Sequence, residues 1–148
     1  MTRIRTHASM AYTPRQMYDL VNDIAAYPAY LPLCSQARVL GKTVNRLTAT
    51  ITLAKAKLGF DFTIAHTLGD ERRIDVSLVD GPFKRLRGTW LFEPASHGGC
   101  EVTFDLDFEF SNPVLSMAFG GLFKSIAEAM VGAFAEQAAL RYGKPANR

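Results

Sequence analysis

Cysteine and histidine are scarce in this sequence of 148 residues, which has two of the first and three of the second. Cys34 and Cys100 form no CxxC pair, so a disulfide framework is excluded, and we expect two reduced thiols in a cytoplasmic protein. His7, His66 and His97 are scattered, and no two of them have the spacing of a helical metal motif. The sequence therefore predicts no metal site.

Several motifs of catalysis and phosphate binding are also missing. The sequence contains no GxGxxG or GxxxxGK loop for phosphates and no GxSxG element for a nucleophilic serine. Its longest apolar run, residues 114–123, is interrupted by Ser116 and Gly120-Gly121 and is shorter than the roughly 20 residues that span a bilayer. No repeat or linker divides the chain, so we expect a single domain over residues 1–148, with a flexible tail at residues 143–148.

Hydrophobic residues make up 48% of the sequence and charged residues 21%, which is typical of a globular protein. Ten of the residues are phenylalanine, an apolar side chain with no polar group, so many of these rings must line a core or an apolar cavity. The net charge of +3 permits contact with nucleic acid or an anionic membrane but does not require either.

The N-terminal part of the sequence predicts one strand and two short helices. Residues 4–9 are typical of a strand, and Thr13-Pro14 then supplies an N-cap and a proline suited to the first helical turn. The helix should end before Tyr27-Pro28, because the residue before a proline is displaced from the helical region. Residues 27–32, with two prolines and two tyrosines, predict a short helical turn over an apolar surface.

The middle of the sequence alternates apolar and polar residues, which predicts antiparallel strands with one buried and one solvated face. The alternating segments are residues 37–40, 47–53, 58–65, 74–78, 85–92 and 102–110. Glycine-rich breaks between them indicate turns.

A long helix is predicted from Asn112-Pro113 to about Leu140, with Asn112 as its N-cap. Its apolar face is predicted from helical spacing and comprises Leu115, Phe119, Leu122, Ile126, Met130 and Ala133, widened by Phe123 and Phe134. Gly120-Gly121 has two interpretations, a locally weak helix or a place where a ligand or a strand backbone comes close.

These elements predict an α+β, helix-grip fold, in which a curved antiparallel sheet wraps around the long C-terminal helix and two short helices follow the first strand. The space between helix and sheet is the candidate ligand site. Its predicted lining comprises Phe60, Phe62, Ile64, His66, Trp90, Phe104, Leu106, Phe108, Phe110, Leu115, Phe119, Leu122, Phe123, Ile126 and Met130. The same side chains could instead fill an ordinary core, and the pattern leaves both interpretations open.

Polar candidates for chemistry are few. His66 is in phase with the inward phenylalanines, so it is either a general acid or base or a buried histidine bonded to backbone. Asp105, Asp107 and Glu109 have the opposite phase and should be solvated, which argues against a carboxylate pair in a pocket. Cys34 has no identifiable base partner for a nucleophilic role.

A second candidate surface is basic. Arg85 and Arg87 share the outer face of a strand, and Lys84 can turn to the same side. Such a surface would bind phosphate groups of RNA or anionic lipids, or it is simply a solvated face.

Three segments carry a resemblance to a known family. They are Met17-Tyr18-Asp19-Leu20-Val21 through Asp23-Ile24, Tyr27-Pro28 and Leu31-Pro32 to Cys34; Val79-Asp80-Gly81-Pro82-Phe83-Lys84 with Leu86, Gly88, Trp90 and Phe92; and Cys100 with Val102, Phe104, Phe108-Glu109-Phe110 and Asn112-Pro113. In this order they resemble the coenzyme Q-binding START-like family. Its bacterial branch is also described as the RatA type of ribosome-association toxin, within a polyketide cyclase-like superfamily.

The resemblance implies a START/Bet v 1-like domain with a hydrophobic tunnel. It implies ubiquinone or another prenyl lipid as the bound ligand, without a covalent cofactor, in a carrier or chaperone that supports respiratory electron transport. The alternative that it implies is an inhibitor bound to the large ribosomal subunit, and a polyketide cyclase-like enzyme is a third. We therefore expect a non-enzymatic cytoplasmic protein without DNA as a partner, with peripheral contact at the inner membrane as a further expectation.

Overall fold

The computed structural model of the protein describes residues 2–143, so the predicted tail lies outside the described residues except for Gly143. The elements in chain order are β1 (Thr2–Met10), α1 (Pro14–Asn22), the 3-10 helix η1 (Ile24–Ala29), β2 (Cys34–Lys42), β3 (Arg46–Lys55), β4 (Leu58–Asp70), β5 (Arg73–Asp80), β6 (Phe83–Pro94), β7 (Cys100–Phe110) and α2 (Pro113–Tyr142).

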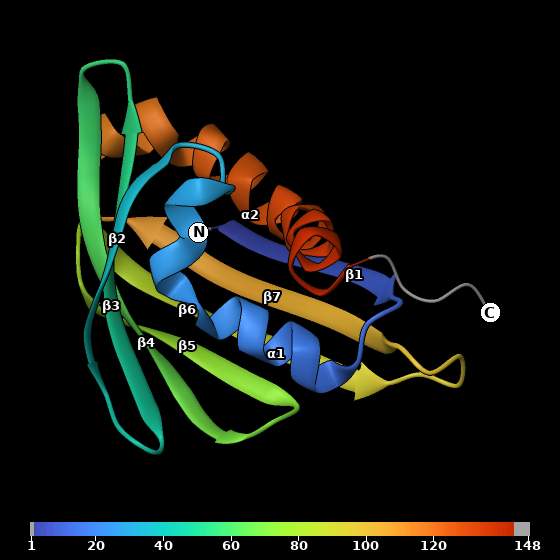
Figure 1. The fold of residues 1–148 in the computed structure, drawn as a ribbon. Helices are drawn as coiled ribbons and strands as arrows, with labels where there is room; N and C mark the ends of the chain where they lie inside the picture. Colours follow the sequence, from blue (N-terminus) through green and yellow to red (C-terminus); the bar gives the residue numbers. More distant parts are fainter. Residues whose placement is uncertain (1, 144–148) are drawn as a thin grey trace.

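The strands form one antiparallel sheet in the order β1-β7-β6-β5-β4-β3-β2. Figure 1 shows this sheet curving around α2, with α1 and η1 on the same side of the sheet as α2. The alternating segments of the sequence place their apolar side chains on the inner face, as in β7, where every second residue from Cys100 to Phe110 is buried. The predicted helix-grip fold is confirmed.

Both helices begin where the capping residues predict. The Thr13 hydroxyl accepts a hydrogen bond from the Gln16 backbone N–H at 3.1 Å, and the Gln16 side chain accepts one from the Thr13 N–H at 2.9 Å. The Asn112 side chain accepts from the Val114 N–H at 2.8 Å. α1 ends at Asn22, before Tyr27-Pro28 as predicted, and the 3-10 helix η1 begins at Ile24.

The buried face of α2 differs from the predicted one. Its buried residues are Phe119, Phe123, Ala127, Val131, Phe134 and Ala138, so the stripe is centred on Phe123. Leu122 is half-buried and lies outside the core cluster, and the prediction that it faces the sheet is wrong. The error arises because α2 is apolar on nearly all sides, so no polar face marks the side that meets solvent.

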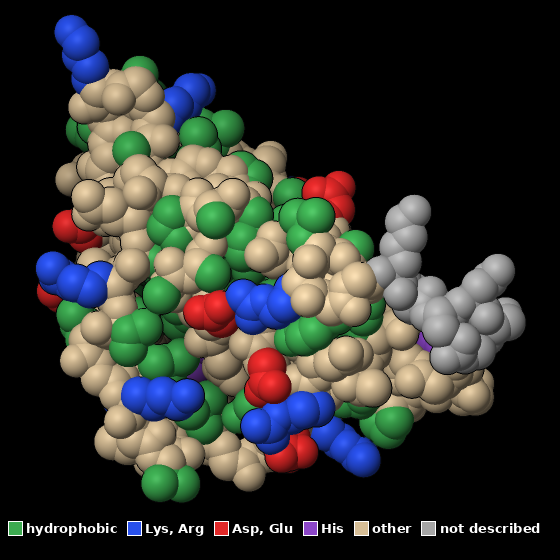
Figure 2. Space-filling view, in the orientation of Figure 1, with side chains coloured by type: hydrophobic (Ala, Val, Ile, Leu, Met, Phe, Trp, Pro, Cys, Tyr) green, Lys and Arg blue, Asp and Glu red, His purple; other side chains and the backbone are tan. Residues whose placement is uncertain are grey.

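Several apolar residues of α2 are exposed, among them Val114, Met117 and Leu140. Figure 2 shows hydrophobic side chains at the surface over the centre of this face, above α2 and η1. By length and composition α2 could cross a membrane, but the core helix of a soluble protein passes the same test. Phe119, Phe123 and Phe134 of α2 pack against the sheet, while 28% of the most apolar stretch of this helix is buried.

Gly120 and Gly121 do not mark a close approach of the sheet. A Cβ atom added at Gly121 would meet no atom within 4 Å, and one at Gly120 would meet only the Ser116 hydroxyl at 4.0 Å. The interpretation that a strand backbone comes close here is therefore wrong. The glycines weaken the helix locally without making room for another part of the fold.

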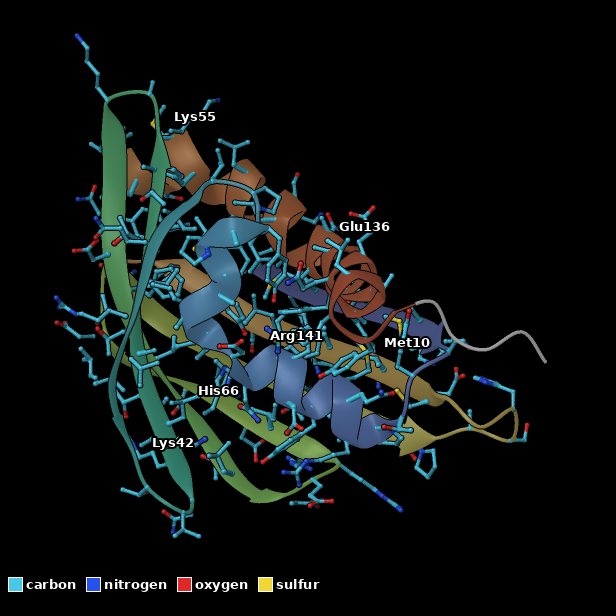
Figure 3. The ribbon with its side chains drawn as sticks, in the orientation of Figure 1. Met10, Lys42, Lys55, His66, Glu136 and Arg141 are labelled. Atoms are coloured by element: carbon cyan, nitrogen blue, oxygen red, sulfur yellow. The ribbon has the colours of Figure 1, made fainter. Side chains whose placement is uncertain are left out.

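The C-terminal end of α2 is tied to the first helices. The Arg141 guanidinium lies 2.6 Å from the Asp23 carboxylate, and the Tyr142 hydroxyl donates to the Gln16 carbonyl at 2.9 Å. Figure 3 shows Arg141 reaching from α2 toward α1. These contacts hold α1 and η1 over the opening of the sheet, which places them beside the candidate site.

Candidate functional site

Aromatic rings fill one end of the space between α2 and the sheet. Phe83 stacks on Phe110 with ring centroids 4.5 Å apart, and Phe108 meets Phe123 at 4.6 Å. Phe60 lies between this cluster and the helix, 5.0 Å from Phe119. At this end the inward phenylalanines are an ordinary packed core, which was one of the two interpretations that the sequence left open.

The other end contains a cavity of about 80 Å³ between the sheet, η1 and α2. It is lined by Tyr27, Leu31, Pro32, Cys34, Ile51, Leu53, Phe62, Ile64, His66, Val76, Leu86, Trp90, Phe104, Leu106, Phe123, Ile126, Ala127 and Met130. These side chains are apolar almost without exception. An apolar cavity with a few placed polar groups is the usual form of a small-molecule site.

The predicted lining divides between the cavity and the aromatic core. Phe62, Ile64, His66, Trp90, Phe104, Leu106, Phe123, Ile126 and Met130 line the cavity. Phe60, Phe108, Phe110 and Phe119 belong to the packed core, while Leu115 and Leu122 are half-buried, and none of these six lines the cavity. Ligand binding by the lining residues stays a prediction.

Sequence reasoning missed half of the cavity wall. The missed residues are Tyr27, Leu31, Pro32, Cys34, Ile51, Leu53, Val76, Leu86 and Ala127. Ile51 and Leu53 carry the same alternating signal as the predicted residues, so they could have been found from it. The segment from Tyr27 to Cys34 has no period, and only its tyrosines and prolines indicated that it covers something apolar.

The lining residues that are least buried lie on α2 and in the connection from η1 to β2. Pro32 in that connection is exposed, and Ile126 and Met130 on α2 are half-buried. Trp90 and Phe104, whose rings stack at 4.1 Å, form part of the opposite, fully buried wall. A ligand would therefore approach past Ile126 and Met130 and reach the strands last.

His66 is the one polar side chain classed as buried within residues 2–143, and it is only 2% exposed. It comes from β4, beneath α1 (Figure 3), and its Nδ1 lies at hydrogen-bond distance, 2.8 Å, from the Asn22 side-chain oxygen. The expected bond to backbone is replaced by this bond to a side chain of α1. Burial lowers the pKa of His66 to about 4, so the ring is neutral at pH 7.

Two other polar groups of the wall are already bonded within the protein. The Tyr27 hydroxyl donates to the Val21 carbonyl, and burial raises the pKa of Tyr27 well above its usual value. The Cys34 thiol donates to the Gln36 carbonyl at 3.6 Å, and burial raises the pKa of Cys34 to about 11. The thiolate that a nucleophilic cysteine needs is therefore disfavoured.

The predicted basic surface lies on the outer face of the sheet, far from the cavity wall. A bulge at the start of β6 turns both Lys84 and Arg85 outward, since Phe83 and Leu86 on either side are buried. The strand register places Arg85 opposite Glu109 and Arg87 opposite Asp107, and Lys84 Nζ lies 3.5 Å from Glu109. The basic side chains thus stand beside carboxylates of β7, which weakens their attraction for an anionic partner.

A sheet that grips one long helix over an apolar cavity defines a START-like domain, and comparison with known proteins gives its family. The chain belongs to the family described as polyketide cyclase / dehydrase and lipid transport, whose pattern matches residues 10–135. The resemblance drawn from the sequence motifs is confirmed. The family contains both enzymes and lipid carriers by its description, so membership alone does not fix the activity.

Relatives bear two kinds of name. The ribosome association toxin RatA of Escherichia coli (strain K12) is 43% identical over 138 residues, which cover 93% of this chain and 87% of the relative. A coenzyme Q-binding protein, the mitochondrial COQ10 homolog B of Xenopus laevis, is 28% identical, with 91% of this chain and 57% of the relative covered. A solved START superfamily protein from Mycobacterium smegmatis matches with a TM-score of 0.74 at 18% identity, over 93% of this chain and 97% of that one.

Proposed function

We propose that the protein binds a prenylquinone of the ubiquinone type in this cavity and carries it without chemical change. The observation that supports this is the apolar wall with the buried side chain of His66, whose ring has one nitrogen without a hydrogen-bond partner among the described residues. Each buried CH₂ group of a prenyl tail would contribute about 0.8 kcal/mol, and His66 would meet the polar ring. The coenzyme Q-binding name of one relative points to the same ligand class.

The size of the cavity sets a condition on binding. A volume of about 80 Å³ is smaller than the 300–1,000 Å³ typical of sites for drug-sized ligands. The cavity must therefore widen when a quinone ring enters. The unbranched side chain of Met130, which is half-buried at the opening, can change conformation at little cost.

A carrier role rather than catalysis fits the polar groups of the wall. A general acid or base must be free to exchange a proton near the pH of the reaction. Tyr27 and Cys34 are bonded within the protein and hold their protons at neutral pH, and His66 stays neutral. These groups offer no acid and base pair for a cyclase or dehydrase reaction.

The proposal is tested by lipid extraction of the protein purified without detergent and by titration with a short-chain ubiquinone analogue. Mass spectrometry should find prenylquinone in the extract, and Ala127→Leu, which adds three carbons inside the cavity, should weaken binding of the analogue at least tenfold. Ala129→Leu is the matched control, because Ala129 is exposed on the other side of α2. An extract without quinone, together with no binding of the analogue, would reject the proposal.

A second candidate function is association with the large ribosomal subunit, which is favoured by the name of the RatA relatives. The candidate surface is the basic one of Lys84, Arg85 and Arg87. Replacing all three by alanine should weaken co-sedimentation with purified large subunits. The salt dependence should also fall, by roughly 0.7–0.9 in log–log slope for each phosphate group that the variant no longer binds.

The control for the ribosome experiment replaces Lys55 and Lys57, which lie at the β3–β4 turn and not on β6. Ala127→Leu should leave ribosome binding unchanged if the two surfaces act separately. Anionic liposomes provide the comparison for a peripheral membrane contact, where removal of the three cations should cost about 1 kcal/mol per charge. If the variant binds ribosomes and liposomes as the wild type does, this basic surface is an ordinary solvated face without a binding role.

A further inference from the structure

We propose that the cavity selects the reduced, hydroquinone form of its ligand, because His66 presents a hydrogen-bond acceptor rather than a donor to the ligand ring. This inference rests on the proposed function and adds to it the chemical state of the ligand. It follows from the contact between His66 on β4 and Asn22 at the end of α1.

The first step is the proton position on the imidazole ring. The Asn22 side-chain oxygen lies 2.8 Å from His66 Nδ1, and a carboxamide oxygen can only accept, so Nδ1 carries the hydrogen. A neutral imidazole has one N–H, so Nε2 has a lone pair and no hydrogen. The low pKa that burial gives His66 keeps the ring in this neutral form at physiological pH.

The second step is the match with a ligand. His66 lines the cavity, and Nδ1 is occupied by Asn22, so Nε2 is the ring nitrogen left for a ligand. A quinone carbonyl only accepts hydrogen bonds, and two acceptors facing each other in an apolar cavity leave both unpaired. A hydroquinone hydroxyl instead donates its hydrogen to Nε2, so neither group is left unpaired.

The size of the preference follows from the cost of an unpaired buried polar group. That cost corresponds to a ratio of about tenfold or more between the two forms. A tenfold tighter binding of the reduced form raises the midpoint potential of the bound two-electron couple by about 30 mV. The protein would therefore retain the hydroquinone and release the oxidised quinone more readily.

The test compares decylubiquinol and decylubiquinone by anaerobic equilibrium dialysis against the same protein. We expect the wild-type protein to bind decylubiquinol about tenfold more tightly. Asn22→Leu removes the acceptor that fixes the tautomer and should bring the ratio toward one. His66→Leu should abolish the preference while the apolar wall still binds the tail.

Two controls separate this inference from general effects on the fold. Tyr30→Phe removes another buried hydroxyl, which lies outside the cavity wall, and should leave the ratio unchanged. The ¹⁵N spectrum of His66 in the unaltered protein should show a protonated Nδ1 and an unprotonated Nε2, a result that needs no variant to fold. An Nε2–H tautomer, or equal affinity for the two forms, would overturn the inference and leave quinone binding intact. Binding of neither form would overturn both.

Discussion

The buried His66 makes the stability of the folded protein depend on pH. Its pKa is lowered to about 4 in the folded protein, against 6.5 as the ordinary value, because burial disfavours the charged ring. Between these pH values the unfolded chain binds a proton that the folded protein does not. The free energy of unfolding therefore falls as the pH is lowered through this window.

We expect the wild-type protein to lose about 2 kcal/mol more stability than His66→Gln between pH 7 and pH 5. Urea denaturation at the two pH values measures the difference. Equal slopes for wild type and His66→Gln would show that folding does not lower the pKa of His66.

The partner of His66 was beyond the reach of sequence reasoning. The phase of β4 indicated that His66 points inward, and it does. Asn22, however, is 44 residues away on a different element, and an asparagine at the end of a short helix carries no signal of its own. Pairings of this kind depend on how α1 lies over the sheet, which no local pattern specifies.

The face that α2 turns toward the sheet can be tested with two neighbouring residues. Phe123 contacts the rings of Phe62, Phe83 and Phe108, so Phe123→Ala should lower the free energy of unfolding by about 3–5 kcal/mol. Leu122→Ala, on a half-buried residue outside the core, should cost about 1 kcal/mol. Urea unfolding of both variants measures the two losses. A larger loss for Leu122→Ala than for Phe123→Ala would mean that Leu122 faces the sheet, as the sequence predicted.

Two glycines should respond to alanine in opposite ways. Gly121→Ala should raise the free energy of unfolding by about 1 kcal/mol, since alanine favours the helix and its Cβ meets nothing within 4 Å. Gly88→Ala should destabilise the protein, because its Cβ would lie 2.7 Å from the Asp105 carbonyl oxygen on β7. Thermal unfolding of both variants is the measurement. A destabilised Gly121→Ala would indicate that something does pack against this part of α2.

The elements differ in how well the sequence specifies them. The sequence predicted a strand at the place of each of the seven, most of them from alternation, and capping residues located the starts of both helices. The buried face of α2 was predicted only in part: Phe119, Phe123 and Phe134 are buried but Leu122 is not, because no polar face marks the solvent side of this helix. The extent of the cavity was not predictable either, since it depends on which large side chains happen to fill the space beneath α2.

Charges of both signs share the outer face of the sheet, which limits what net charge can say about partners. The acidic side chains of β7 lie between basic ones on both neighbouring strands, with Arg5 of β1 3.4 Å from Asp105 and Lys84 of β6 3.5 Å from Glu109. The net charge of +3 is therefore not gathered on this face. An anionic partner would have to displace these ion pairs, so its binding should be sensitive to salt.

The position of β1 has a consequence for how the protein is made. β1 pairs with β7, and this pairing joins Thr2 to Phe108, although β1 is synthesised first. At 5–20 residues per second the ribosome takes about 5–20 s to make the roughly 100 residues between them. During that time β1 has no partner strand. Its pairing with β7 closes a loop of roughly 100 residues, which is slow because of the entropy that the chain loses.

We expect nascent chains arrested before residue 100 to leave β1 sensitive to protease, and full-length chains released from the ribosome to protect it. Limited proteolysis of arrested chains, read from cleavage after Arg3 and Arg5, makes the comparison. Early protection of these arginines would mean that β1 finds another partner first. The last strand to emerge, β7, thus joins β1 to the rest of the sheet. A chain that stops before β7 would leave the backbone hydrogen-bonding groups of both β1 and the β7-facing edge of β6 unpaired.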